Sequence, residues 1–176
     1  LEGKTVCKSC AAGYTTTTGD DAASHDELAD CSLCAAGYGG IATVIDDELS
    51  GCPACVAGTY KGAVANSLCT DTASAGQMTV DASNTYVATG AVNAINCPVG
   101  TYDSGTAGLG ACEVCAIGSY QDEAGKTECK TCEDGYSTSS TGSTSTASCS
   151  LCAVGYGGNA SAAPNASGCT ACVAGT

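Results

Sequence analysis

Apolar residues in this chain stand singly or in pairs and never gather into the long periodic runs of helices or buried strands. Between them lie stretches of Gly, Ser, Thr, Asp and Ala, and Cys or Tyr takes most of the positions that a core residue would fill. Short runs bounded by Gly and small polar residues predict short strands and turns, with very little helix. No segment has the roughly 18 consecutive apolar residues of a membrane-spanning helix.

The cysteines form a repeated motif, in which the second cysteine of each Cys-x-x-Cys pair is followed by x-x-Gly. Tyr comes next, directly or one residue later, in every pair except Cys169/Cys172, where the sequence ends at Thr176. This place holds seven of the eight tyrosines. We expect the Gly to allow a positive φ or a close backbone approach. We expect the Tyr to pack on the disulfides with its hydroxyl at the surface. The seven pairs are Cys7/Cys10, Cys31/Cys34, Cys52/Cys55, Cys112/Cys115, Cys129/Cys132, Cys149/Cys152 and Cys169/Cys172, and Cys97 has the same tail without a first cysteine.

A longer repeat is superimposed on this motif. Residues 149–158 repeat residues 31–40 at nine of ten positions, and residues 168–176 repeat residues 51–59 at eight of nine. The sequence therefore has a first half-period A, a half-period B from about residue 60, and a second A from about residue 123. Both ends fall inside a module, so we expect the sequence to be part of a longer repetitive protein.

Residues 70–96 contain no cysteine. Short strands are predicted at 79–80, 86–87 and 92–95, with breaks at 81–84 and at Gly90. We predict a small β insertion here, with a plain linker as the alternative. It would join two sets of disulfide-linked modules, residues 1–69 and residues 97–176.

Composition explains why disulfides are needed. Only 22 residues are Leu, Ile or Val, and the chain has neither Phe nor Trp, but it has 16 Cys. Cross-links can replace a hydrophobic core in small secreted modules. The net charge of −13, with five Lys and no Arg, lacks the basic surface of a nucleic-acid binder. The predicted fold class is small disulfide-rich repeats, with short two-stranded β modules and loops stacked into an elongated rod.

Two disulfide arrangements use the cysteines consistently. In the first, each Cys-x-x-Cys closes on itself and Cys69 pairs with Cys97. The second is staggered, leaves Cys7 and Cys172 for further modules, and closes larger loops, which stabilise more. We favour the staggered arrangement, which gives Cys10–Cys31, Cys34–Cys52, Cys55–Cys69, Cys97–Cys112, Cys115–Cys129, Cys132–Cys149 and Cys152–Cys169.

The sequence gives only weak signals for metal binding or catalysis. Paired Cys-x-x-Cys motifs also fit zinc ribbons, but Cys69 and Cys97 break the four-ligand pattern. His25 has no nucleophile or base around it, and the acidic clusters match no spaced calcium loop. We therefore expect no enzyme activity, no metal and no cofactor.

Sequons and hydroxyl-rich runs predict glycosylation. Asn159 and Asn165 each begin an Asn-Ala-Ser sequon, the acceptor of N-linked glycans. Two tracts rich in Ser and Thr are candidates for O-linked glycans, with bare polar loops as the alternative. Their candidate residues are Thr15, Thr16, Thr17, Thr18, Ser137, Thr138, Ser139, Ser140 and Thr141.

The Cys-x-x-Cys-x-x-Gly-[Thr/Ser]-Tyr signature resembles the ephrin-receptor-like cysteine-rich repeat, a relative of growth-factor-receptor and tumour-necrosis-factor-receptor modules, over most of the chain except 70–96. The acidic, arginine-free background rich in Ala, Thr and Ser is similar to the immobilisation antigens and related surface proteins of ciliates. These resemblances imply two-stranded modules stacked into a rod with a ladder of bridges.

These features predict an extracellular or cell-surface structural protein, a repeat segment of a coat, filament or fibre. Its partners would be other copies or further modules of the same protein, with covalently attached glycans and no nucleic acid. The alternative is a receptor or adhesin ectodomain that binds a protein or glycan ligand. An exposed apolar or aromatic patch would favour the alternative, with Met78 and Tyr86 as candidates.

Overall fold

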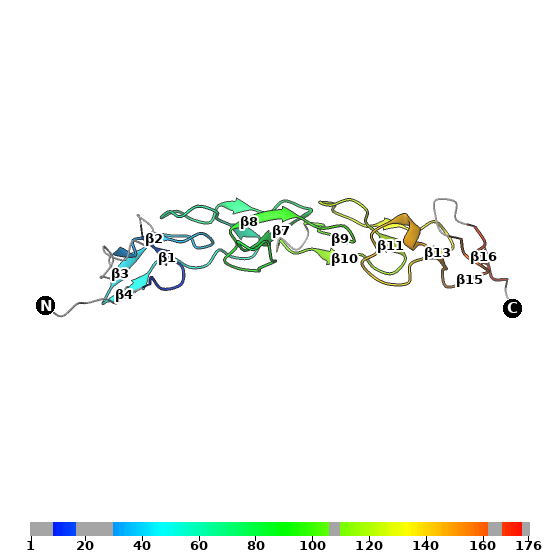
Figure 1. Ribbon diagram of the computed structural model, residues 1–176, viewed down its shortest axis with the longest axis horizontal. Coiled ribbons are helices and arrows are strands. Elements are labelled where there is room, and N and C mark those ends of the chain that lie inside the picture. The colour runs from blue at the N-terminus through cyan, green and yellow to red at the C-terminus, as the bar shows by residue number, and fades with distance from the viewer. Residues whose placement is uncertain (1–8, 17–29, 106–109, 162–166, 174–176) are drawn as a thin grey trace. The chain divides into compact units, whose positions relative to one another are not determined.

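The computed structural model describes residues 9–16, 30–105, 110–161 and 167–173 (Figure 1). The chain divides into two compact units. Unit 1 contains residues 1–73 and 79–94, and unit 2 contains residues 74–78 and 95–176. Helix is nearly absent from the described residues, where η2 (Thr146–Ser148) is a single 3₁₀ turn.

Every strand pairs with its neighbour along the chain, which gives a series of local two-stranded sheets. Such short strands follow from the sequence, because Gly, Cys or a turn interrupts each apolar run within a few residues. The strands are β1 (Tyr14–Thr15), β2 (Leu33–Cys34), β3 (Thr43–Ile45), β4 (Glu48–Ser50), β5 (Thr59–Tyr60), β6 (Asp71–Thr72), β7 (Gln77–Val80), β8 (Asn93–Asn96), β9 (Thr101–Tyr102), β10 (Glu113–Val114), β11 (Ser119–Tyr120), β12 (Lys130–Thr131), β13 (Tyr136–Ser137), β14 (Leu151–Cys152), β15 (Tyr156–Gly157) and β16 (Thr170–Ala171).

Most of these pairs share one plan, which we call the module hairpin. Its first strand holds the tyrosine of the motif, and its second strand lies at the next cysteine pair. In β11–β12, Ser119 pairs with Thr131 and Tyr120 pairs with Lys130. A disulfide joins the cysteine before the first strand to the cysteine before the second. The predicted fold class of small disulfide-rich repeats, built from short two-stranded β modules with very little helix, is confirmed.

The described residues contain seven disulfides, and these join the same cysteines as the staggered arrangement. Each bridges a Cα–Cα distance of 5.4–5.8 Å. Cys172 is free and exposed, and Cys7 lies outside the described residues. The bonds are Cys10–Cys31, Cys34–Cys52, Cys55–Cys69, Cys97–Cys112, Cys115–Cys129, Cys132–Cys149 and Cys152–Cys169.

Successive modules are joined by a recurring set of backbone hydrogen bonds around the glycine of the motif. Gly100 donates its N–H to the carbonyl of Gln121 (2.7 Å) and accepts from the N–H of Cys115 (3.0 Å). The carbonyl of Cys115 in turn accepts from Gly142 (2.8 Å). The same bonds join Gly76 to Asp103, Cys97 to Gly76 and Gly125 to Cys97, and, in unit 1, Gly37 to Lys61, Cys55 to Gly37 and Gly90 to Cys55.

The joints require glycine. Gly100 has a φ of 79°, in the left-handed region. A Cβ added there would overlap with the carbonyl oxygen of Gly142. The positive φ and the close approach expected from the sequence are therefore both present, and a side chain at this place would push the modules apart.

The third residue after the motif glycine is buried and polar in five modules, although little apolar core surrounds it. Each of these side chains bonds to the backbone nearby. For example, Gln121 is 2% exposed, donates to the carbonyl of Glu128 (2.6 Å) and accepts from the N–H of Glu123 (3.1 Å). Buried polar groups are stable only when they are hydrogen-bonded in this way. The five residues, which we call the central polar residues, are Lys61, Thr79, Asp103, Gln121 and Thr138.

The cysteine-free segment follows the same plan without a disulfide. Ala73 stands three residues before Gly76, where other modules have their second cysteine, and Met78 stands in the place of the tyrosine. Ala73 donates to the carbonyl of Gly58 (2.9 Å), the bond that Cys132 makes to Gly118 (2.9 Å). Ala94 stands three residues before Cys97, in the place of a first cysteine. With β7 paired to β8, residues 73–97 form a module in which two alanines replace the bridged cysteines.

The tyrosine hydroxyls differ from the sequence prediction at two modules. Tyr136 is buried, and its hydroxyl accepts a hydrogen bond from the N–H of Cys169 (3.3 Å). Tyr14 accepts in the same way from Cys52 (3.3 Å). The expectation that these hydroxyls face solvent is wrong, because the backbone N–H at the next disulfide needs an acceptor.

Candidate functional site

The β3–β4 hairpin of unit 1 carries several exposed apolar side chains. It lies within the loop closed by the disulfide Cys34–Cys52. Asp46 and Asp47 form its turn with φ values of 51° and 62°, as in type I′ turns, which fit the twist of two-residue hairpins. Val44 pairs with Leu49 and Ile45 with Glu48.

Three of its apolar side chains are exposed, Ile41 (66%), Val44 (43%) and Ile45 (59%), and we call this set the apolar patch. Val44 and Ile45 are consecutive in β3, so they lie on opposite faces of the two-stranded sheet. In the described chain β3 and β4 pair only with each other, so their outer edges carry no further strand. Exposed apolar residues beside an open strand edge are typical of a binding surface. Sequence reasoning had pointed instead to Met78, which is half-buried in β7, and to Tyr86.

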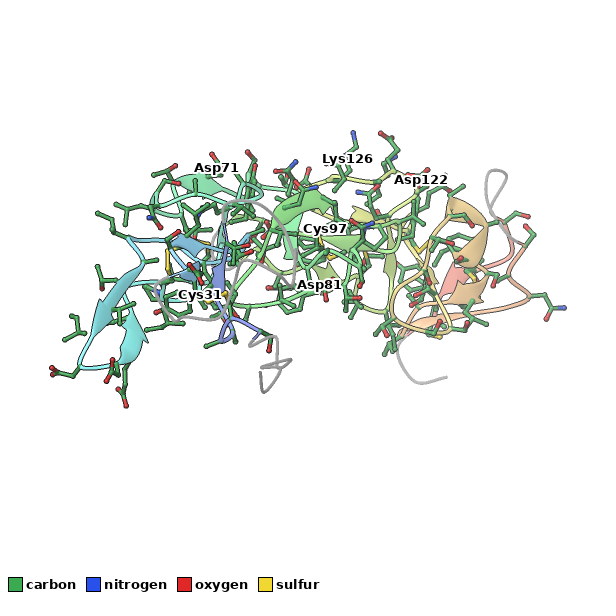
Figure 2. All side chains as sticks on the ribbon, turned by 60° about the vertical axis from the view of Figure 1, so that its left-hand side comes forward. Cys31, Asp71, Asp81, Cys97, Asp122 and Lys126 are labelled. Carbon is green, nitrogen blue, oxygen red and sulfur yellow. A yellow bond between two sulfur atoms is a disulfide. The ribbon has the colours of Figure 1, made fainter. Side chains whose placement is uncertain are left out.

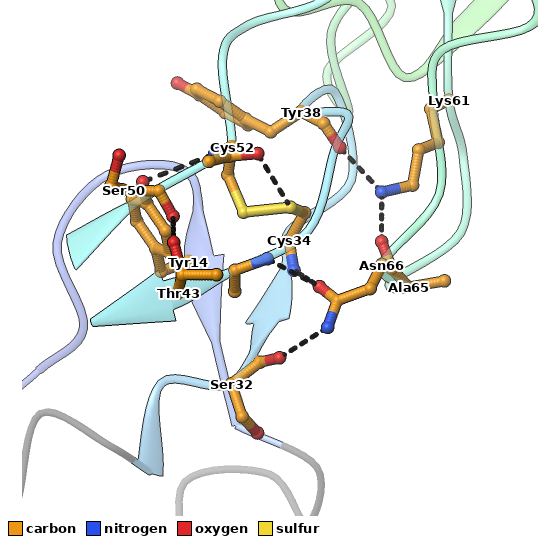
Figure 3. The surroundings of a disulfide bond; sticks show 12 residues. Tyr14, Ser32, Cys34, Tyr38, Thr43, Ser50, Cys52, Lys61, Ala65 and Asn66 are labelled. Carbon is orange, nitrogen blue, oxygen red and sulfur yellow. Dashed lines mark hydrogen bonds between the residues drawn. A yellow bond between two sulfur atoms is a disulfide. The ribbon is translucent and has the colours of Figure 1, made fainter. Parts of the chain in front are cut away.

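The base of the hairpin is fixed by one asparagine. The side-chain oxygen of Asn66 accepts from the N–H groups of Cys34 and Ala42 (3.1 Å each), and its Nδ2 donates to the carbonyl of Ser32 (2.8 Å), as Figure 3 shows. Three backbone groups are thereby held by a single side chain. The hairpin is therefore presented from a rigid base.

The side chain of Lys61 also holds the backbone next to Asn66 by hydrogen bonds (Figure 3). Its Nζ donates to the carbonyls of Tyr38 (2.6 Å) and Ala65. The residue is 4% exposed, and burial lowers the pKa of its ammonium below the ordinary value. No carboxylate in the described chain forms an ion pair with it. Since Thr, Asp and Gln fill the equivalent places, Lys61 is a structural residue.

The second half-period A, in unit 2, has an equivalent base, where Ser161 and Ser167 form an antiparallel bridge as Thr43 and Ser50 do. Gly158 and Gly168 have φ values of 125° and 98°, close to the 133° and 94° of Gly40 and Gly51. In both copies a Cβ on the first glycine would overlap with the carbonyl oxygen of the second. The two loops therefore have the same base, and they differ in sequence and in length, with ten residues at 41–50 and nine at 159–167.

A cluster of charges lies at the β11–β12 hairpin. Lys130 bonds to Asp122 (2.6 Å) and Glu123 (3.0 Å), and Lys126 pairs with Glu123 (2.8 Å). Figure 2 shows Lys126 and Asp122 at the surface. Hydrogen bonds from Lys126 and Lys130 lower the pKa of Glu123 to about 2. Those from Asp122 and Glu123 raise the pKa of Lys130. The cluster is internally neutralised, so it does not present a cationic surface.

The predicted glycosylation residues are in different settings. Asn159 is exposed, whereas Asn165, Thr17 and Thr18 lie outside the described residues. Ser139, Ser140 and Thr141 are exposed, while Thr15, Thr16 and Ser137 are partly covered. Thr138 is 2% exposed, donates to the carbonyl of Ser140 and accepts from Gly118. Its hydroxyl is therefore used within the fold.

The structure assigns no catalytic group. His25 lies outside the described residues, and within the described ranges no three His, Cys, Asp or Glu side chains gather at a distance that would hold a metal. A cysteine in a disulfide also has no thiolate to offer zinc. None of the helical segments described is long and apolar enough to cross a membrane.

Part of unit 2 matches a known protein family. The model of the family described as tyrosine-protein kinase ephrin type A/B receptor-like matches residues 103–149. This segment holds β11, β12 and β13 and the disulfides Cys115–Cys129 and Cys132–Cys149. The ephrin-receptor-like cysteine-rich domain is a non-catalytic module of receptor ectodomains. Together with its disulfides, this similarity identifies the chain as an extracellular or secreted cysteine-rich protein.

Proposed function

We propose that the chain is a repeat segment of a non-enzymatic extracellular structural protein, such as a surface coat or a filament. The supporting observation is the recurring joint between modules. Its bonds are made by backbone groups and its central polar residue changes from Lys to Thr, Asp and Gln. Modules can therefore be added in series without a new interface for each, as in other repeat proteins.

Charge is consistent with this role. The net charge of −13 favours solubility of a repetitive chain and keeps it separated from other anionic surfaces. Lateral contacts between copies would then require local apolar surface, and the apolar patch of Ile41, Val44 and Ile45 supplies some.

Electron microscopy of negatively stained native material tests the proposal. We expect filaments or ordered arrays that dissociate when the disulfides are reduced. Dispersed particles at all protein concentrations would contradict it.

The second candidate is a receptor or adhesin ectodomain with a protein ligand, and the apolar patch is the observation that favours it. In that case the native material stays dispersed, and Val44→Ser with Ile45→Ser weakens adhesion to the ligand-bearing surface. The exposed pair Val114→Ser and Ile117→Ser in unit 2 is the matched control. If filaments form equally well with either pair of substitutions, the apolar patch has no role in assembly.

A further inference from the structure

The two equivalent hairpins agree at every position of a sequon except one. Residues 41–43 read Ile-Ala-Thr and residues 159–161 read Asn-Ala-Ser. The hydroxyl of Thr43 donates to the carbonyl of Ser50 (3.3 Å), and that of Ser161 donates to the carbonyl of Ser167 (3.2 Å). The hydroxyl residue of the sequon is thus present and identically placed in both hairpins. Of the three requirements of a sequon, residues 41–43 therefore lack only the acceptor asparagine.

The acceptor position points to solvent in both copies. Ile41 is 66% exposed, and Asn159 is exposed. The closely matched glycines at the base hold the backbone at both positions in the same way. A large group attached at this place therefore meets no part of the hairpin base.

We propose that Asn159 carries an N-linked glycan, at the place where the equivalent hairpin exposes Ile41. The transfer joins Nδ2 of Asn159 to the anomeric carbon of an activated glycosyl donor. It breaks the bond from that carbon to the diphosphate leaving group of the donor, and the amide releases one proton. The donor and its transferase belong to the secretory route, which the disulfides also require.

The hydrogen bonds of the Ser161 hydroxyl indicate whether glycan transfer comes before or after folding of the loop. In the folded hairpin this hydroxyl also lies 2.8 Å from the hydroxyl of Ser167 and accepts from the N–H of Ser167 (2.9 Å). The sequon hydroxyl is thus occupied once the hairpin closes, so transfer precedes closure of the Cys152–Cys169 loop. The consequence is a chain with one apolar hairpin and one glycan-covered hairpin on otherwise equivalent modules. This holds for a structural protein and for a receptor alike.

The test uses the chain secreted from a eukaryotic host, with glycopeptide mapping before and after enzymatic removal of N-linked glycans. We expect the glycan on Asn159, its loss in Asn159→Gln and Ser161→Ala, and its retention in Ser161→Thr and Asn165→Gln. An unmodified Asn159 in chain from a host that glycosylates a co-expressed control protein would overturn the proposal.

A gain-of-site variant tests the equivalence of the hairpins. Ile41→Asn creates an Asn-Ala-Thr sequon, and we expect residue 41 to be modified to an extent comparable with residue 159. Ile45→Asn, which creates no sequon because residue 47 is Asp, is the matched control and should remain unmodified. Failure of Ile41→Asn in a disulfide-bonded chain would show that the position in the hairpin does not determine acceptance.

Discussion

Replacing Ala73 and Ala94 with cysteine is expected to add a disulfide to the module of residues 73–97, which lacks one. The two alanines are 21 residues apart, as are Cys10 and Cys31. Each occupies a place that a bridged cysteine fills in the neighbouring modules. The double variant should therefore close the gap between Cys55–Cys69 and Cys97–Cys112 in the series of bonds.

The magnitude follows from the closed loop. In the chain-entropy model a loop of about 20 residues stabilises the folded state by about 3 kcal/mol. In the native chain this module is held by hydrogen bonds without a disulfide. They include the bonds from Cys97 to Gly76 (2.8 Å) and from Val92 to Val80 (2.9 Å). Its amides should accordingly open at lower free energy than those of the bridged modules. In the double variant their protection should rise by a factor on the order of 100, since each 1.4 kcal/mol is tenfold.

Hydrogen exchange of residues 74–96, measured by mass spectrometry, checks this expectation. Formation of the new disulfide is detected as a loss of two hydrogens from the intact mass. The Ala73→Ser, Ala94→Ser double variant is the matched control and should leave protection unchanged. Two free thiols in the oxidised double variant would refute the equivalence of these positions to bridged cysteines. A bond that forms without added protection would refute the view that this module is the weak point.

Four further outcomes are expected. Reduction should abolish resistance to proteases while chelation should not, and non-reducing peptide maps should contain no bridge between the two cysteines that flank residues 70–96. The pKa of Glu123, about 2 rather than 4.5, implies stabilisation that is full above about pH 4.5 and lost as the pH falls toward 2; in a carboxyl NMR titration Lys130→Met should move this pKa upward. Gln121→Ala removes two hydrogen bonds, to the carbonyl of Glu128 and from the N–H of Glu123, and should lower the free energy of unfolding by about 1–3 kcal/mol, whereas Thr131→Ala, at an exposed place, should change it little in urea unfolding.

The sequence predicted the hairpins because their determinants are local. Cysteine spacing fixes which loops can close, and the Gly-Tyr motif fixes where each first strand begins. The cysteine-free segment was harder to interpret, because a count of cysteines cannot detect a module that has lost both. Its signals were present in Gly76 and Met78 and in the position of Ala94, but they are visible only when the segment is aligned on the glycine rather than on cysteine.

The central polar residues were missed for a different reason. Lys61, Asp103 and Gln121 share no side-chain chemistry, and a search for apolar periodicity ignores all of them. They are buried because backbone carbonyls and N–H groups of the following loop need partners, which several polar side chains can provide. What recurs along the sequence is thus the absence of an apolar residue three places after the glycine.

The residues that join the modules are different from the residues that the loops expose, and this has a consequence for function. Disulfides, glycines and central polar residues hold each module without help from the residues that the β3–β4 hairpin and its equivalent present. Those residues can therefore change completely at constant stability, from Ile, Val and Ile in one copy to a sequon in the other. A folded core of Leu and Phe would restrict such exchange, because apolar loop residues would compete to be buried in it. A protein built in this way can vary its exposed surface from repeat to repeat while its modules continue to join in the same manner.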